Sequence, residues 1–267
     1  MNGEVNKSMH GFLIDLDGTL YKGNEAIPGA KEFVELLNKN GLPYLLVTNN
    51  SSRSPEHVAG HLNRMGIEVG PERVYTTAMA SVQYLLEHGS GNRVYCIGEE
   101  GLQSALLEAG FELTDKEPDY VVQGIDRQLT YDKLASAVKH LLDGARYILT
   151  NPDHLLPSDS GLIPGAGSIG ALIRTASGAN PVVIGKPSPV IMNYALARLE
   201  LQAKDTWVIG DNTATDIGGG IAAGCRTALV LTGLATEANV REHISKSGNE
   251  PDLICRDLPH FWNSLMK

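Results

Sequence analysis

Short apolar runs alternate with longer amphipathic stretches along the chain. The first apolar run, Phe12–Asp15, has the character of a strand, and the stretch 29–40 after it carries apolar side chains at helical spacing. A strand over Tyr44–Thr48 follows, then a helix that opens at Ser54-Pro55, where a capping serine precedes a first-turn proline. A short strand over Arg73–Thr76 continues the series. This alternation predicts βαβ units and a parallel sheet.

The same alternation continues to the end of the chain. In the middle, strands are predicted at 93–97, 120–124 and 147–150, with helices near 100–109, 131–142 and 168–175. In the C-terminal part, strands are predicted at 181–185, 206–210 and 227–231, again with helices between them. The fold class predicted from this order is α/β, with a Rossmann-like parallel-sheet core.

Two patterns in this series look functional but favour a structural interpretation. Gly165–Gly170 fits the dinucleotide pattern G-x-G-x-x-G, yet residues 157–164 before it are turn-like, and no acidic residue follows at the spacing a ribose needs. We therefore expect a tight turn into a helix there. His57 and His61 are four residues apart on a predicted helix, and with no third ligand nearby in the sequence we expect a surface or packing role.

Composition and charge exclude several classes of protein. The length of 267 residues fits one large or two modest domains. With 42% hydrophobic and 20% charged residues, the chain can form ordinary cores and is not expected to be disordered. The net charge of −9 and the lack of a basic stripe argue against a nucleic-acid partner. No apolar run approaches the roughly 18 residues of a membrane span, and the polar start has no signal-peptide core. Cys96, Cys225 and Cys255 are scattered, so we expect reduced thiols and a cytoplasmic protein.

Candidate chemistry begins at the end of the first strand, in Asp15-Leu16-Asp17-Gly18-Thr19-Leu20. Strands of an open parallel sheet present such residues at their carboxyl edge, where these folds bind ligands. Asp15 is the candidate nucleophile, since a carboxylate with an ordinary pKa of about 3.9 is ionised at neutral pH without a base. Asp17 would then protonate the leaving oxygen and later accept a proton from water. The alternative is an ordinary Asp-Gly turn.

Three further groups of polar residues follow predicted strands. Thr48, Asn49 and Asn50 could hold phosphate oxygens, although a plain Asn/Ser turn explains them as well. Lys186, after the strand at 181–185, could neutralise a phosphate and the Asp15 carboxylate, or could be a solvated surface lysine.

Asp211 and Asp216 follow the strand at 206–210. Asp211 with Asp15 would complete a site for Mg²⁺, a hard cation held by few carboxylates and several waters. Asp216 would bind the metal, directly or through water, or orient Lys186; otherwise it is an ordinary helix-surface acid.

The spacing of these groups predicts the domain organisation. They fall at 15–20, 48–50, 186 and 211–216, so a gap of about a hundred residues with its own strands and helices separates the second from the third. We therefore expect a core domain of residues 1–79 and 181–267, interrupted by a smaller α/β cap domain of residues 80–180.

Taken together, the four groups resemble the motifs of the haloacid dehalogenase superfamily over nearly the whole chain. Gly185-Lys186-Pro187 and Gly210-Asp211-Asn212, followed by Thr215-Asp216-Ile217, resemble the NagD-like branch, which includes p-nitrophenyl and sugar phosphatases. The resemblance implies a Rossmann-like core, a large α/β cap, Mg²⁺ and an aspartyl-phosphate intermediate, with the backbone carbonyl of Asp17 as a further metal ligand. The founding dehalogenases lack the second aspartate, so Asp17 argues against dehalogenation.

These features predict a Mg²⁺-dependent phosphatase of small phosphorylated metabolites, such as sugar phosphates, nucleotides or p-nitrophenyl phosphate. The alternatives are a phosphomutase that uses the same intermediate and a non-catalytic sensor of phosphorylated metabolites. Specificity would lie in the cap, where the loops 124–127 and 150–154 either face the substrate or are ordinary polar loops. A cap surface could also form a homodimer contact.

Overall fold

The chain forms two compact units, described here from a computed structural model that covers residues 11–158 and 161–266. The first unit comprises the residues up to 48, residues 55–75 and the residues from 186 onward, and the second comprises residues 49–54 and 76–185. The junctions at 75/76 and 185/186 lie a few residues from the boundaries at 79/80 and 180/181 expected from the sequence, whereas the place of residues 49–54 in the second unit was not expected.

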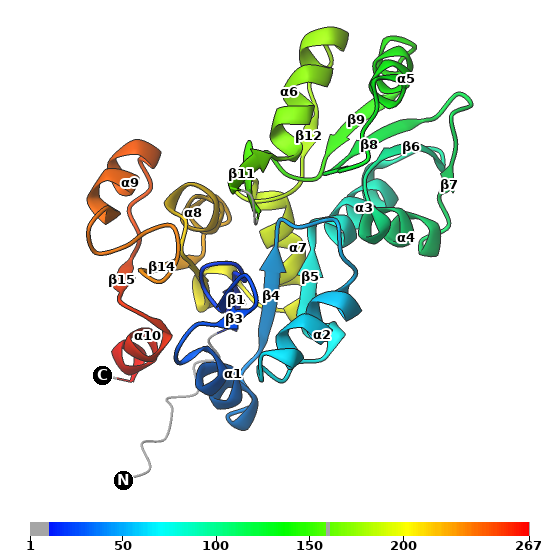
Figure 1. Cartoon of the computed structure of the whole chain (residues 1–267). Helices are drawn as coiled ribbons and strands as arrows, with labels where there is room; N and C mark the ends of the chain where they lie inside the picture. Colours follow the sequence, from blue (N-terminus) through cyan, green and yellow to red (C-terminus); the bar gives the residue numbers. More distant parts are fainter. Residues whose placement is uncertain (1–10, 159–160, 267) are drawn as a thin grey trace. The chain divides into compact units, whose positions relative to one another are not determined.

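The first unit contains a six-stranded sheet in the order β15-β14-β13-β1-β4-β5 (Figure 1). Its strands are β1 (Gly11–Ile14), β4 (Tyr44–Thr48), β5 (Val74–Thr76), β13 (Thr206–Gly210), β14 (Arg226–Val230) and β15 (Leu253–Cys255). β1 pairs in parallel with β13 on one side and with β4 on the other. The predicted α/β class with a parallel core sheet is therefore confirmed.

Helices and a small hairpin surround this sheet. They are α1 (Ala30–Lys39), α2 (Pro55–Arg64), α7 (Pro189–Leu199), α8 (Gly218–Ala222), α9 (Val240–Ser247) and α10 (Leu258–Leu265), with short helices η1 (Pro71–Arg73), η2 (Ala203–Asp205) and η3 (Thr213–Ile217). Strands β2 (Tyr21–Lys22) and β3 (Glu25–Ala26) form the hairpin directly after the first aspartates. The helix α7 begins as its sequence predicts, because Ser188 accepts a hydrogen bond from the Val190 N–H and Pro189 occupies the first turn.

Aromatic side chains fill the core between the sheet and the helices α1 and α10. Phe12 on β1 meets Phe33 of α1 and Phe261 of α10 edge to face, with ring centroids 6.3 and 6.2 Å apart. Trp207 on β13 meets Phe261 in the same way at 5.4 Å. Such pairs add about 0.5–1.5 kcal/mol each beyond the burial of their area, so this layer fixes β1 and β13 beside each other.

The second unit has its own five-stranded sheet in the order β12-β9-β8-β6-β7. The strands are β6 (Arg93–Ile97), β7 (Glu112–Leu113), β8 (Tyr120–Gln123), β9 (Arg146–Leu149) and β12 (Val182–Val183), and their pairs are parallel. The helices α5 (Tyr131–Leu142) and α6 (Ala166–Ser177) bury Ala137, Leu141 and Ile173 against one face of this sheet. The helices α3 (Thr77–His88) and α4 (Glu100–Glu108) lie on the other side (Figure 1).

Some elements differ from those expected. The strand expected at 181–185 pairs with β9 as β12, so it belongs to the second sheet and not to the core sheet. Residues 157–164 were expected to be turn-like, but 157–158 and 161–164 lie in two antiparallel strands, β10 (Leu155–Ser158) and β11 (Gly161–Pro164). Residues 159–160 lie outside the described part of the chain. The helix expected at 168–175 begins at Ala166, and Gly165 before it is extended, so the tight turn expected there is replaced by a direct step from β11 into the helix. The strand β15 and the helix α3 were not anticipated.

Other expectations concern the cysteines and the membrane. Cys96, Cys225 and Cys255 are free thiols, as expected. Across residues 11–158 and 161–266, no helix combines the length and the apolar character needed to cross a bilayer.

Candidate active site

Three of the predicted site residues of the first unit lie at the ends of adjacent strands. Asp15 follows β1, Asp211 follows β13, and Thr48 ends β4. The backbone N–H of Asp15 donates to the carbonyl of Ile209 at 2.8 Å, which continues the β1–β13 ladder to the strand end. The chain runs outward from β1 in one direction to β4 and β5 and in the other to β13, so these ends lie where ligands bind in open α/β sheets.

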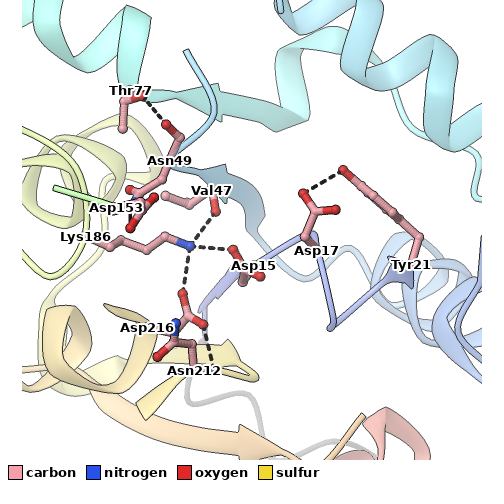
Figure 2. A network of polar contacts seen from close by, with 10 residues as sticks. All are labelled: Asp15, Asp17, Tyr21, Val47, Asn49, Thr77, Asp153, Lys186, Asn212 and Asp216. Carbon is pink, nitrogen blue, oxygen red and sulfur yellow. Dashed lines mark hydrogen bonds and ion pairs between the residues drawn. The ribbon is translucent and has the colours of Figure 1, made fainter. Parts of the chain in front are cut away.

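Lys186 joins two of the carboxylates from within the protein. Its Nζ donates to Asp15 Oδ1 at 2.5 Å, to Asp216 Oδ1 at 2.7 Å and to the Val47 carbonyl at 3.1 Å (Figure 2). The side chain is only 3% exposed. The interpretation of Lys186 as a solvated surface lysine is therefore wrong.

Asp216 reaches the cluster because the backbone after β13 is wound as a π-helix turn, η3. Its Oδ2 accepts a hydrogen bond from the backbone N–H of Asn212 at 3.1 Å, and Asn212 Oδ1 accepts one from the Ala214 N–H at 2.9 Å. Single π turns inside helices are often found at functional sites. Asp216 is 2% exposed, so it is not a helix-surface acid.

Two backbone segments close around Asp211. The N–H of Leu234 donates to Asp211 Oδ2 at 2.5 Å. A Cβ placed on Gly233 or on Gly18 would lie 1.9 or 2.2 Å from the same oxygen, so both positions need glycine for this close approach. Sequence reasoning missed the loop 232–234, although its position directly after the strand predicted at 227–231 was a usable signal.

Oxygen atoms of Asp15, Asp211 and Asp216 lie within 4.8 Å of one another. Burial raises the pKa of Asp15 well above its usual range, and the charge of Asp216 adds to this, while Lys186 opposes it. Burial and the charge of Asp216 also raise the pKa of Asp211, to about 7. Burial alone would lower the pKa of Lys186, but the charges of Asp15 and Asp216 outweigh it and raise that pKa.

This donor set fits a hard divalent cation. All three side chains offer carboxylate oxygen, the ligand that Mg²⁺ prefers. Burial and repulsion between the acids raise the pKa values of Asp15 and Asp211, and a bound cation would relieve that repulsion. The residues present therefore fit the magnesium site expected from the sequence.

Asp17 lies outside this carboxylate cluster. Its side chain is exposed, and its Oδ2 accepts a hydrogen bond from the hydroxyl of Tyr21 at 3.2 Å (Figure 2). The two aspartates therefore occupy different environments, with Asp15 largely buried beside a lysine and Asp17 open to solvent. Different environments are what a nucleophile and an acid/base require. Sequence reasoning did not identify Tyr21.

The predicted phosphate-binding residues are divided between the units. Thr48 is buried at the end of β4 in the first unit. Asn49 and Asn50 belong to the second unit, where Asn49 Nδ2 donates to Asp153 Oδ2 at 3.1 Å and Asn50 Oδ1 accepts from the Ser52 hydroxyl at 2.7 Å. Asp153 lies in one of the two loops left open by the sequence. The phosphate-binding role of these residues stays a prediction.

Comparison with known proteins agrees with the fold and with this geometry. Residues 12–112 match the family model of haloacid dehalogenase-like hydrolases, and residues 183–261 match a further model described as HAD-hydrolase-like. The chain is 43% identical over 262 residues to an acid sugar phosphatase of Staphylococcus saprophyticus, which covers 98% of this chain and 100% of that protein. The chain therefore belongs to the haloacid dehalogenase-like hydrolases.

Other relatives define its place in the family. The 5'-nucleotidase YutF of Bacillus subtilis is 42% identical over 96% of this chain and 100% of that protein. The structure of a p-nitrophenyl phosphatase from Archaeoglobus fulgidus superposes with a TM-score of 0.92 at 36% identity, covering 96% of this chain and 99% of that one. NagD of Escherichia coli K-12 superposes with a TM-score of 0.86 at 34% identity, covering 94% and 96%. The chain is a phosphoric monoester hydrolase of the NagD-like branch.

Proposed function

We propose that the protein is a Mg²⁺-dependent phosphatase of small phosphorylated metabolites that acts through an aspartyl-phosphate intermediate. The observation that carries this proposal is the buried group formed by Asp15, Asp211, Asp216 and Lys186 at the carboxyl ends of β1 and β13. It offers one nucleophilic carboxylate, further oxygen ligands and a fixed positive charge in a small volume.

In the first step, an Asp15 carboxylate oxygen attacks phosphorus, and the bond between phosphorus and the leaving oxygen breaks. Asp17 donates its proton to that leaving oxygen, so the alcohol departs neutral. In the second step, water attacks the phosphorus of the aspartyl-phosphate while Asp17 takes the proton of the water. Phosphate and the free Asp15 carboxylate result, and Asp17 is protonated again.

The remaining residues bind and orient the phosphoryl group. Asp15, Asp211 and Asp216 would hold Mg²⁺, together with the Asp17 carbonyl that the family resemblance implies. When bound, the cation supplies positive charge against the phosphoryl oxygens. Lys186 keeps Asp15 pointed toward the site and adds a second positive charge, while Thr48, Asn49 and Asn50 donate hydrogen bonds to the phosphate. Electrostatic stabilisation of this kind dominates phosphoryl transfer.

The printed names of the relatives support hydrolysis and guide the choice of substrates. They are an acid sugar phosphatase, a 5'-nucleotidase and p-nitrophenyl phosphatases. We therefore expect sugar phosphates and nucleoside 5'-monophosphates to be hydrolysed, with p-nitrophenyl phosphate as a convenient probe. Isomerisation of a sugar phosphate faster than phosphate release would favour the phosphomutase alternative.

The direct test is p-nitrophenyl phosphate hydrolysis with Mg²⁺, with EDTA, and by the Asp15→Asn variant. We expect activity only with Mg²⁺ and wild-type Asp15, and an acid-quenched reaction should show the mass of one phosphoryl group on the wild-type protein. Asp143→Asn is the matched control, because Asp143 is an exposed acid paired with Lys139 on a helix of the second unit. Turnover by Asp15→Asn at the wild-type rate would refute the assignment of the nucleophile.

A further inference from the structure

We propose that Tyr21 is a positioning residue for Asp17, and that His61 in turn holds Tyr21. In this arrangement the Tyr21 hydroxyl holds the Asp17 carboxyl group in place to protonate the leaving oxygen. The rate at which the enzyme expels strongly basic leaving groups then depends on that hydroxyl. The inference rests on the proposed function, in which Asp17 protonates the leaving oxygen. It assigns a catalytic consequence to two residues that the motifs do not include.

The contact joins a buried side chain to an exposed one. Tyr21 is 7% exposed, whereas Asp17 is exposed to solvent. The Tyr21 hydroxyl donates a hydrogen bond to Asp17 Oδ2 at 3.2 Å. An exposed carboxylate without a fixed partner rotates among several conformations. A hydrogen bond from a buried ring selects one of them and so fixes the direction in which the carboxyl group faces.

Hydrogen bonds also hold the backbone between Asp17 and Tyr21 in a tight turn. The Gly18 N–H donates to the Tyr21 carbonyl at 2.8 Å, and the Leu20 N–H donates to the Leu16 carbonyl at 2.8 Å. The register of β2 with β3 then pairs Tyr21 with Ala26. The ring of Tyr21 therefore leaves the backbone at a fixed point next to Asp17.

His61 on α2 supports both the ring and the hairpin that carries it. The two rings meet edge to face, with centroids 5.1 Å apart and an angle of 87° between their planes. His61 Nε2 lies 3.0 Å from the Gly23 carbonyl at the tip of the hairpin, which fits a donated hydrogen bond. His61 is 8% exposed, so the predicted packing role is confirmed, and the residue that it packs against is Tyr21.

The chemical consequence depends on the leaving group. A general acid within reach contributes about 10²–10⁴ in rate, and misplacement by about 1 Å can cost about 10². A weakly basic leaving group such as p-nitrophenolate departs with little help from a proton. Phenolate is more basic and needs the proton more. Loss of positioning should therefore penalise phenyl phosphate more than p-nitrophenyl phosphate, two substrates of similar shape.

The test compares kcat/KM of wild type and Tyr21→Phe on these two substrates, because kcat/KM reports the step that expels the leaving group. Tyr21→Phe keeps the ring against His61 and removes only the hydroxyl. We expect kcat/KM to fall about tenfold on phenyl phosphate and by at most about twofold on p-nitrophenyl phosphate. In an Asp17→Asn background, the same change should have no further effect, since the residue it positions is already disabled.

Tyr44→Phe is the matched control. Tyr44 is also buried in the first unit, and its hydroxyl donates to Asn38 Oδ1 at 3.0 Å, away from the aspartates. The variant should leave the ratio of the two kcat/KM values unchanged. His61→Phe, which keeps a ring but loses the bond to Gly23, should shift that ratio in the direction of Tyr21→Phe by a smaller factor.

The outcomes separate the inference from the proposed function. A wild-type protein that hydrolyses neither ester refutes the proposed function. An active wild type whose Tyr21→Phe variant loses equal activity on both esters, or loses none, overturns the inference alone. An undiminished effect of Tyr21→Phe in the Asp17→Asn background would also overturn it, because the hydroxyl would then act independently of Asp17.

Discussion

The charges around Lys186 do not balance by themselves. Among the described residues, three buried or largely buried carboxylates share one ammonium group. Unpaired charge inside a protein is costly, and the raised pKa values of Asp15 and Asp211 express that cost. Under the proposed function, the site gives up stability to gain affinity for a cation. Removing one of its acids and removing its lysine should therefore change the free energy of unfolding with opposite signs when no metal is bound.

Asp211→Asn tests this trade. The substitution removes one like charge from the cluster and keeps an oxygen for the Leu234 N–H. In EDTA at pH 8, where Asp211 with its pKa of about 7 is ionised, we expect the variant to have a larger free energy of unfolding than wild type. Mg²⁺ should reverse the order, because a ligand at 100 times its Kd stabilises by about 2.7 kcal/mol and the variant binds it weakly. Urea denaturation with and without Mg²⁺ measures both. A variant stabilised by Mg²⁺ as much as wild type would contradict the assignment.

Lys186→Met should have the opposite sign. The methionine fills much of the space but leaves Asp15 and Asp216 without the buried cation that bonds both. Breaking a buried ion pair on one side typically costs about 3–5 kcal/mol, and we expect a loss of this order in urea denaturation together with a fall in kcat. Lys139→Met, at an exposed i,i+4 pair with Asp143, is the control and should leave the urea midpoint almost unchanged. Equal losses in the two variants would mean that Lys186 is not the centre of the cluster.

Among the secondary-structure elements, the turns after the strands also fix the positions of the site residues, because they pack against the site side chains. The loop after β1 and the loop after β14 both approach Asp211, and each does so with a glycine. Gly18 also has a φ of +82°, a left-handed conformation that disfavours other residues. The two loops thus hold Asp211 from both sides, and they can come this close because Gly18 and Gly233 have no side chain.

Gly18→Ala and Gly41→Ala separate backbone strain from this fit. Both glycines have positive φ, +82° and +62°, so both variants should lose about 1–2 kcal/mol of stability. Only at Gly18 does the new Cβ meet Asp211 Oδ2, whereas nothing lies within 4 Å of it at Gly41. We expect Gly18→Ala to lose most of its phosphatase activity and Gly41→Ala to keep it, measured at a temperature where both remain folded. Full activity in Gly18→Ala would show that Asp211 can move without harm.

The positions of strands could be predicted from the sequence where one apolar run corresponds to one strand. β1, β4 and β13 lie within a residue of where the apolar runs predicted them, and each is fully buried. β6 also lies at its predicted residues, although only Val94 and Ile97 in it are buried. β12 was assigned to the wrong sheet, because an apolar run does not say which neighbour it pairs with. The strand pair β10–β11 was missed because its two prolines and its glycine are typical of turns.

At the scale of the whole molecule, the same limit applies to the site. Residues at strand ends, such as Asp15 and Asp211, could be predicted, because parallel strands bring their carboxyl ends to one edge. The contacts of Tyr21 with Asp17 and of Asp153 with Asn49 could not, because they depend on side chains that loops bring together. Position along the chain gives no information on such pairs.

The division into two units predicts that the second is stable alone. The fragment 76–185 contains every strand of the five-stranded sheet and its covering helices. It lacks residues 49–54, whose Ser52 carbonyl accepts a hydrogen bond from the Gly101 N–H at 3.2 Å. We expect the fragment to show a cooperative urea transition with native-like circular dichroism, and adding residues 49–54 through a linker should raise the midpoint. A fragment without a cooperative transition would contradict the division.

The strand order of the first sheet also has a consequence for synthesis. β1 pairs with β13, which begins roughly 190 residues later, so on the ribosome one flank of β1 waits about 10–40 s for its partner at 5–20 residues per second. Asp15 acquires Lys186 only near the end of that wait, while every strand of the second sheet is complete before Lys186 is made. The nascent chain therefore exposes an apolar strand edge, and an acid without its lysine, for most of its translation.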